Sequence, residues 1–259
     1  MRRVRRAGPE DGGPPLAFVR TDAQWVIVTI LHRDEHLLVV NKPPGLLSQS
    51  DHTGDPDVVS RGKELLAEGA AAAPFLGLVH RLDRPASGVM ALARSSEAAR
   101  HLSRQFRERL VEKRYAVVVE GTLRGIGTWT DYIAKPDRQP RLVDPDHPDG
   151  KRATLEWQVL ESDGDRTLLQ VTLRTGRPHQ IRLQATSRGH PVMGDDRYGA
   201  SVSLTGRAIA LHHVLLRADH PARPRRETFV AVPPTCWSGV LTDAMDAALR
   251  RMLDHERPS

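Results

Sequence analysis

Short apolar runs separated by turn residues dominate the chain from about Trp25 onward. Runs of this kind, rich in β-branched residues and bounded by Gly, Pro or polar clusters, predict strands. The first clear run, His36 to Asn41, is followed by a Lys-Pro-Pro-Gly turn signal at residues 42–45. The predicted strands cover residues 36–41, 75–79, 89–93, 115–119, 153–160, 167–173, 208–216 and 228–232.

Residues 95–112 predict a helix, because apolar side chains recur there at one-turn spacing and Ser95 or Ser96 can cap the first turn. Further helices are predicted at residues 57–72, 177–188 and 240–253, whereas residues 135–150, rich in Pro, Asp and Arg, predict a mobile loop. Many strands with few helices, and no regular strand–helix alternation, favour an α+β fold over a doubly wound parallel sheet.

Length and composition narrow the class of protein. A chain of 259 residues can form one large domain or two small ones. Its one cysteine, Cys236, excludes an intrachain disulfide and fits a reducing compartment such as the cytoplasm. No stretch approaches the roughly 18 apolar residues of a membrane span, so no membrane partner is expected. Residues 1–24 begin with a basic segment followed by Gly and Pro, and predict a disordered arm.

The charge points to an anionic partner. Net charge is +6, and the 38 basic residues comprise five lysines and 33 arginines. Arginine binds phosphate through two parallel hydrogen bonds and stacks on bases, which favours RNA or DNA as the partner. A GC-rich genome would explain the arginine count equally well, but it explains the net charge less easily.

The strongest local signal is the loop His80 to Gly88, in which Asp83 lies between Arg81 and Arg84. Loops between rigid strands often carry chemistry. Flanking cations favour an ionised carboxylate, which can act as a nucleophile or a base. From this segment alone, a surface hairpin with mutually screened charges explains the pattern equally well.

Two further segments carry candidate groups. Leu173 to Arg182 is a turn leading into a helix that gathers Arg177, His179 and Arg182, and such a patch can bind phosphate or orient a carboxylate. Tyr115 begins a strand just after Lys113-Arg114, where its ring can stack on an unpaired base, worth about 1–3 kcal/mol. The alternatives are a solvent-exposed basic helix face and an ordinary core tyrosine.

Metal and nucleotide sites are weakly supported. His32, Glu35 and His36 match an H-x-x-E-H zinc pattern, but that pattern needs a helix and here it adjoins a predicted strand. His212 and His213 point to opposite faces of a predicted strand. No glycine motif for phosphates is present, so neither a metal nor a cofactor is expected, and a metal-dependent hydrolase remains only an alternative.

Taken together, the segments resemble the RluA-type family of RNA pseudouridine synthases. The resemblance spans about residues 30–234. The blocks that carry it are, in order, Val40 to Gly45, His80 to Gly88, Lys113-Arg114-Tyr115, Thr175 to Arg182, Gly189-His190-Pro191, Gly194-Asp195, Tyr198-Gly199, Leu211-His212 and His220-Pro221.

The resemblance implies a role for each matching residue. Asp83 is similar to the catalytic aspartate, Tyr115 to the tyrosine that packs on the target uracil, and Arg182 to the arginine that pairs with the aspartate. The expected substrate-binding residues are Arg81, Arg84, Lys113, Arg177 and Ile181, of which Ile181 would line the base pocket. The implied fold is a mixed, largely antiparallel sheet with peripheral helices and a basic cleft.

The implied reaction detaches uracil from its ribose, rotates it and rejoins it through carbon 5, without a metal or cofactor. Gln184 departs from the histidine common at its position, and Leu46-Leu47-Ser48 is also unusual. The residues before Trp25 are too few for an added RNA-binding domain, so one catalytic domain over residues 25–255 is expected. The expected partner is a tRNA or rRNA stem-loop, and the expected state is a monomer. A non-catalytic RNA-binding module on the same fold is the alternative.

Overall fold

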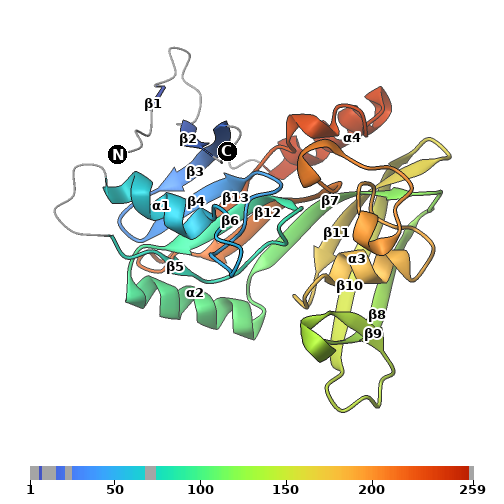
Figure 1. Ribbon diagram of the computed structural model, residues 1–259, viewed down its shortest axis with the longest axis horizontal. Helices are drawn as coiled ribbons and strands as arrows, with labels where there is room; N and C mark the ends of the chain where they lie inside the picture. The colour runs from blue at the N-terminus through green and yellow to red at the C-terminus, as the bar shows by residue number, and fades with distance from the viewer. Residues whose placement is uncertain (1–5, 8–15, 21–24, 68–73, 257–259) are drawn as a thin grey trace. The chain divides into compact units, whose positions relative to one another are not determined.

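The computed structural model describes residues 6–7, 16–20, 25–67 and 74–256 (Figure 1). Contacts divide the chain into two compact units, a finer division than the single catalytic domain expected over residues 25–255. Unit 1 comprises Met1–Val111, Leu215–Val232 and Arg257–Ser259, and unit 2 comprises Glu112–Val214 and Pro233–Glu256.

Unit 1 is built on an antiparallel sheet with the order β1-β2-β3-β4-β6. The short strand β5 pairs with β6, and β13 pairs with the second half of β12. These strands are β1 Arg6–Ala7, β2 Leu16–Arg20, β3 Trp25–Arg33, β4 Leu37–Lys42, β5 Gly77–Leu78, β6 Ser87–Ala93, β12 Leu211–Asp219 and β13 Arg226–Val230. Within the arm predicted to be disordered, two segments thus form strands, and its other residues lie outside the described part.

Two helices cover opposite faces of this sheet. α1 (Val58–Ala67) packs on the face that carries Leu38 and Val40, whereas α2 (Ser96–Glu108) packs on the face that carries Leu37 and Val39. Alternate residues of a strand point to opposite faces, so β4 is covered on both sides and reads as a continuous apolar run. Both helices were predicted; residues 68–72 of the first prediction lie outside the described part.

α2 begins where the sequence predicts and ends earlier. Ser95 is the N-cap, and its side chain accepts a hydrogen bond from the Ala98 N–H. Arg109 adopts a left-handed conformation with φ 62° and stops the helix, so the prediction that it continues to Glu112 was wrong. Leu110 continued the apolar spacing in the sequence, but its side chain is exposed, and β7 starts two residues later.

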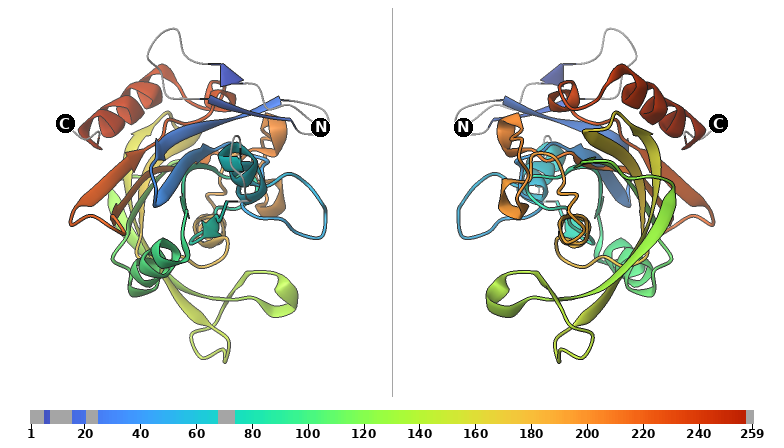
Figure 2. Two further views of the ribbon diagram at one scale, coloured as in Figure 1. Left: turned by 90° about the vertical axis from the view of Figure 1, so that its left-hand side faces the viewer. Right: turned by 90° about the vertical axis from the view of Figure 1, so that its right-hand side faces the viewer.

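Unit 2 is a second antiparallel sheet with the order β7-β11-β10-β8-β9, together with α3, α4 and the first half of β12. Long strands make up its centre, and the loop between β9 and β10 lies at one end of the unit (Figures 1 and 2). The elements are β7 Glu112–Glu120, β8 Ile126–Ala134, β9 Arg141–Val143, β10 Lys151–Ser162, β11 Arg166–Leu173, α3 Gln180–Thr186 and α4 Asp243–Glu256.

The prediction of one mobile loop over residues 135–150 was wrong in part. A 3₁₀ turn forms at Pro136–Arg138, and β9 pairs with β8 through Tyr132 and Val143. The Pro- and Asp-rich composition of this segment gave no strand signal. Its three-residue strand, β9, forms because it pairs with the edge of β8. β8 itself was not predicted. The largely antiparallel α+β class is confirmed.

No helix among the described residues is both long and apolar enough to cross a membrane.

The Ser95 cap gives a stability prediction. Ser95→Ala removes the acceptor for the Ala98 N–H and should lower the free energy of unfolding by about 1 kcal/mol. Urea denaturation measures the change. Ser96→Ala, at an exposed position one residue later, is the control and should stay within about 0.5 kcal/mol of the wild type. Equal losses in the two variants would contradict the capping role.

Candidate active site

Asp83 lies on the loop between β5 and β6, and the residues on both sides of it are fixed to the turn that follows β4. Ser48 Oγ donates to the Leu82 carbonyl at 2.7 Å and accepts from the Leu82 N–H at 3.1 Å. The Gly45 N–H donates to the Arg84 carbonyl at 2.9 Å, and Arg84 Nε donates back to the Gly45 carbonyl at 3.0 Å. The half-buried Asp83 is therefore held from both sides.

Lys42 joins the turn after β4 to the loop that carries Asp83, and the sequence did not single it out. Its side chain is fully buried, and Nζ donates to the carbonyls of Pro43 at 3.0 Å, Leu46 at 2.8 Å and Arg84 at 3.2 Å. An ammonium group has three hydrogens, and these three acceptors account for all of them. A lysine at the buried end of an apolar strand, directly before Pro-Pro-Gly, was the signal available in the sequence.

Burial lowers the pKa of Lys42 from 10.5 to about 7. The charge of Asp83 works to raise this pKa and that of Arg84 to lower it further. The Lys42 ammonium thus attracts the Asp83 carboxylate while it holds the backbone of the neighbouring loop.

The two arginines of the loop, Arg81 and Arg84, differ in their contacts with the rest of the protein. Arg84 Nη2 forms an ion pair with Asp55 at 2.6 Å, in addition to its bond to Gly45. Arg81 is exposed to solvent. Of the two arginines on this loop that are expected to bind substrate, Arg81 therefore presents its charge to solvent, whereas Arg84 also stabilises the loop.

Tyr115 lies in unit 2, on β7, and is almost fully buried. Its ring is stacked on that of His213 with centroids 4.5 Å apart and an interplanar angle of 18°. His212, the other histidine of the pair on β12, contacts Trp237 instead, as expected if the two point to opposite faces. The imidazole of His213 supports the phenol ring, which the sequence did not suggest.

α3 and the turn before it carry the remaining expected residues of unit 2. Ile181 and Arg182 are buried, whereas Lys113 and Arg177 are partly exposed. Arg177 Nε donates to the Arg152 carbonyl at 3.1 Å, and the Arg177 N–H donates to Gln180 Oε1 at 3.0 Å. The predicted basic patch therefore separates into a buried arginine and partly exposed cations.

Arg182 has a buried acidic partner that the sequence reasoning did not assign. Nε lies 2.6 Å and Nη2 2.8 Å from the two carboxylate oxygens of Asp195. The sequence predicted Asp83 as the partner; Asp83 lies in unit 1 and Arg182 in unit 2, and their pairing stays a prediction.

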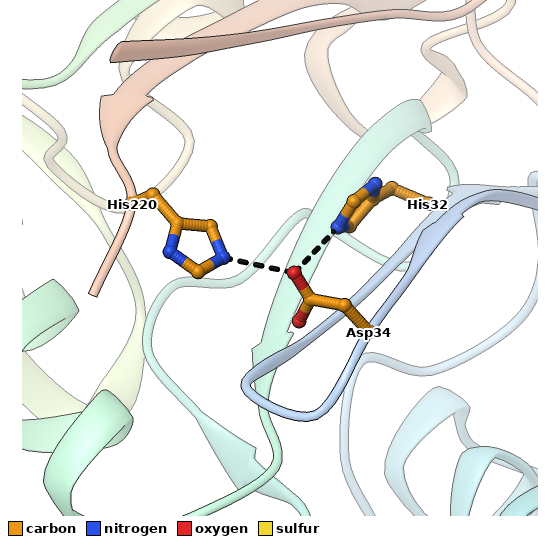
Figure 3. Close-up of side chains that lie close together, drawn as sticks. All are labelled: His32, Asp34 and His220. Carbon is orange, nitrogen blue, oxygen red and sulfur yellow. Dashed lines mark hydrogen bonds and ion pairs between the residues drawn. The ribbon is translucent and has the colours of Figure 1, made fainter. Parts of the chain in front are cut away.

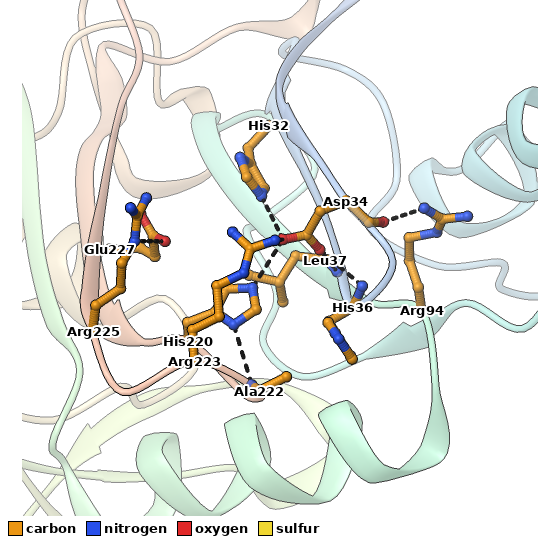
Figure 4. A network of polar contacts seen from close by, with 10 residues as sticks. All are labelled: His32, Asp34, His36, Leu37, Arg94, His220, Ala222, Arg223, Arg225 and Glu227. Atoms are coloured by element: carbon orange, nitrogen blue, oxygen red, sulfur yellow. Dashed lines mark hydrogen bonds and ion pairs between the residues drawn. The ribbon is translucent and has the colours of Figure 1, made fainter.

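A separate cluster in unit 1 brings together His32, Asp34 and His220 (Figure 3). Asp34 Oδ2 lies 3.0 Å from His32 Nε2 and 2.9 Å from His220 Nε2, and Arg223 is 3.4 Å away (Figure 4). The segment joins two strands and is not helical, so His32, Glu35 and His36 do not form the helical zinc site weighed from the sequence.

Asp34 also accepts the N–H groups of His36 and Leu37 through Oδ1, each at 2.8 Å. Partial burial works to raise the pKa of Asp34, but these bonds and those from the His32 and His220 side chains outweigh it. They hold the Asp34 pKa well below its usual value.

The hydrogen bonding of His220 argues against a metal ion in this cluster. The Ala222 N–H donates to His220 Nδ1 at 3.1 Å, so Nδ1 is an acceptor and a neutral imidazole carries its hydrogen on Nε2. That hydrogen points to Asp34, whereas a metal at the cluster would need the Nε2 lone pair. The cluster is a hydrogen-bonded tie between the β3–β4 turn and the segment after β12.

Comparison with solved structures identifies the fold. Human RNA Pseudouridylate Synthase Domain Containing 4 superimposes with a TM-score of 0.67 at 24% identity, over 85% of this chain and 92% of that one. Human RNA Pseudouridylate Synthase Domain Containing 1 gives 0.66 at 23% identity, over 90% and 95%. The chain therefore has the fold of the pseudouridylate synthase domains.

Sequence comparison gives the family. The model described as RNA pseudouridylate synthase matches residues 36–187. The dual-specificity RNA pseudouridine synthase RluA of Salmonella typhi is 35% identical over 86% of this chain and 97% of its own length. The ribosomal large subunit pseudouridine synthase D of Xylella fastidiosa is 36% identical over 89% and 76%. The chain belongs to this family, in its RluA-type branch, and is an RNA pseudouridine synthase, an isomerase, rather than a non-catalytic RNA-binding module.

The burial of Lys42 predicts a pH dependence of stability. The unfolded lysine keeps its proton to about pH 10.5, whereas folded Lys42 releases it as the pH rises through about 7. Above pH 7 the unfolded state then binds more protons, so the free energy of unfolding should rise with pH, by up to about 1.4 kcal/mol per pH unit. Urea denaturation from pH 6 to about pH 9 should show this rise in the wild type relative to Lys42→Met. The exposed Lys63→Met is the matched control; parallel curves for wild type and Lys42→Met would refute the prediction.

The tautomer of His220 predicts that zinc does not bind at the histidine cluster. Titration calorimetry with Zn²⁺ should give the same heats for the wild type and for Asp34→Asn, because Asp34 already receives the two Nε2 hydrogens. One equivalent of zinc bound by the wild type and lost in Asp34→Asn would show that the cluster is a metal site.

Proposed function

We propose that this pseudouridine synthase isomerises uridine in a stem-loop of tRNA or rRNA, with Asp83 as its catalytic carboxylate. Arg182 is the proposed charge partner of Asp83, and Tyr115 the proposed platform for the uracil. The observation that carries the proposal is the fixation of Asp83. Leu82 and Arg84 are both bound to the turn after β4, and the buried ammonium of Lys42 attracts the carboxylate. Enzymes hold reacting groups in place in this way before the substrate arrives.

The chemistry asks three things of these residues. The target base must leave its stack, which costs a few kcal/mol, and stacking on Tyr115 offsets part of that cost. Asp83 then starts cleavage of the bond between the ribose and N1 of uracil. The base rotates, carbon 5 bonds to the ribose and loses its hydrogen, and N1 gains one. No electrons are exchanged with a cofactor in this sequence.

The charge distribution supports the placement of the RNA. Arg81 is exposed beside Asp83, and Lys113 and Arg177 are partly exposed on unit 2, so each can contact phosphate. Ile181 is buried on α3 and suits the apolar side of a base pocket. Arg84 contributes mainly through its bonds to Gly45 and Asp55.

A compact RNA is the substrate we favour. The relative whose name includes dual specificity is matched over 97% of its length, against 76% for the ribosomal synthase D, so the matched part of the chain corresponds to almost all of a dual-specificity enzyme. We propose that the protein acts in the cytoplasm as a monomer and without a metal. Pseudouridine mapping of total RNA from strains with and without the gene identifies the target.

Replacing the proposed catalytic carboxylate tests the site. Asp83→Asn keeps the shape of the side chain but removes its charge and nucleophilicity, so turnover should fall to the background of the assay while RNA binding changes less than about threefold. Tritium release from 5-tritiated total RNA of a strain lacking the gene measures turnover, and filter retention of the same RNA measures binding. Asp51→Asn, at an exposed aspartate of unit 1, is the control and should retain full activity. Turnover by Asp83→Asn would disprove the assignment.

A further inference from the structure

The buried carboxylate of Asp195 holds Arg182. The guanidinium and the carboxylate of Asp195 meet through two parallel hydrogen bonds, from Nε at 2.6 Å and from Nη2 at 2.8 Å. The two side chains are 4% and 1% exposed, so solvent does not compete for the contact. A bidentate pair of this kind fixes both the position and the plane of the guanidinium.

Two neighbouring side chains fix the guanidinium further. The Tyr198 ring lies under it, with Cζ 4.8 Å from the ring centroid. Tyr198 Oη lies 2.8 Å from His179 Nδ1, and Arg182 Nη1 lies 3.4 Å from the same nitrogen. Since an arginine nitrogen can only donate, His179 Nδ1 is the acceptor in that contact. Asp195 thus accepts hydrogen bonds from Nε and Nη2 of Arg182, whereas Nη1 makes the contact with His179.

The backbone around Asp195 is fixed before any substrate binds. The Asp195 N–H donates to the Val192 carbonyl at 3.0 Å, and the Asp195 carbonyl accepts from the N–H groups of Tyr198 and Ala200. Gly194 precedes it with φ +85°, and a Cβ there would lie 2.7 Å from the Ala208 carbonyl oxygen. Only glycine fits this position, so the segment places Asp195 in one orientation.

We propose that Asp195 is a positioning residue of the isomerisation, which orients the guanidinium of Arg182 for its part in the reaction. This inference rests on the proposed function, in which Arg182 is the charge partner of the catalytic carboxylate. Asp195 lies beyond residues 36–187, the part that the family model matches. A purely structural ion pair would also be buried, so the test must separate a loss of fold from a loss of orientation.

A double-mutant cycle makes that separation. Wild type, Asp195→Asn, Arg182→Lys and the double variant are compared by kcat and apparent KM on 5-tritiated total RNA from a strain lacking the gene. Lysine keeps the charge at position 182 but cannot form the bidentate contact. Thermal denaturation confirms that each protein is folded. Asp196→Asn is the matched control, because Asp196 adjoins Asp195 and is exposed.

We expect Asp195→Asn to lower kcat by about 100-fold, the cost of misplacing a reacting group by about 1 Å, with KM unchanged. In the Arg182→Lys background the same substitution should lower kcat by less than about threefold, because the orientation is already lost. Asp196→Asn should match the wild type.

Two results would overturn the inference and leave the proposed function standing. In both, Arg182→Lys is impaired. In the first, Asp195→Asn turns over at the wild-type rate. In the second, Asp195→Asn lowers kcat equally in both backgrounds. Full activity of Arg182→Lys would instead remove Arg182 from the proposed site, and this inference with it. If Asp195→Asn does not fold, Tyr198→Phe enters the cycle in its place. It removes the hydroxyl that contacts His179 and keeps the ring under the guanidinium, and it should lower kcat several-fold in the wild-type background alone.

Discussion

The buried ammonium of Lys42 holds together the part of the molecule that carries Asp83. β4 and β6 are paired so that Lys42 lies opposite Gly88, and this pairing brings the turn after β4 against the loop before β6. Both segments have carbonyl groups that no strand partner takes, and the three hydrogens of the ammonium satisfy one on Arg84 and two on the turn. Burial of this group is costly unless it is hydrogen-bonded, so separating the two loops would break its contact with the Arg84 carbonyl.

The same rule governs the buried charge of unit 2, with different chemistry. Arg182 has a planar group that pairs with the carboxylate of Asp195, whereas Lys42 has a compact charge that bonds to separate carbonyls. The carboxylate fixes an orientation and the carbonyls fix a backbone. Each unit therefore contains a charged group whose freedom has been removed by burial, which suits the catalysis proposed above.

The histidine cluster illustrates how far a pattern of residue types can mislead. His32, Asp34 and His220 include the ligand types of a metal site and lie close enough together to hold an ion. The N–H of Ala222 fixes the tautomer of His220, however, and that tautomer directs a hydrogen at the carboxylate. Whether such a cluster can bind a metal depends on which nitrogen of each histidine carries the hydrogen. For His220, the hydrogen bond from the Ala222 backbone N–H determines this.

The sequence by itself determined β4 to β7 and β10 to β13, the approximate start of α2 and the family, because apolar periodicity, capping and the order of motifs are local properties. It did not predict β1, β2, β3 or β8. It also singled out Asp83, Tyr115 and Arg182 as site candidates. Only the tertiary structure decided what surrounds them. From the sequence, Lys42 was interpreted only as part of a turn signal and of a family block, and Asp195 only as one residue of such a block. Nothing local shows that Lys42 is buried against a residue 42 positions away, or Asp195 against one 13 positions away. β9 and the early end of α2 were missed for the same reason, because a strand edge and a left-handed residue depend on the neighbours that the fold supplies.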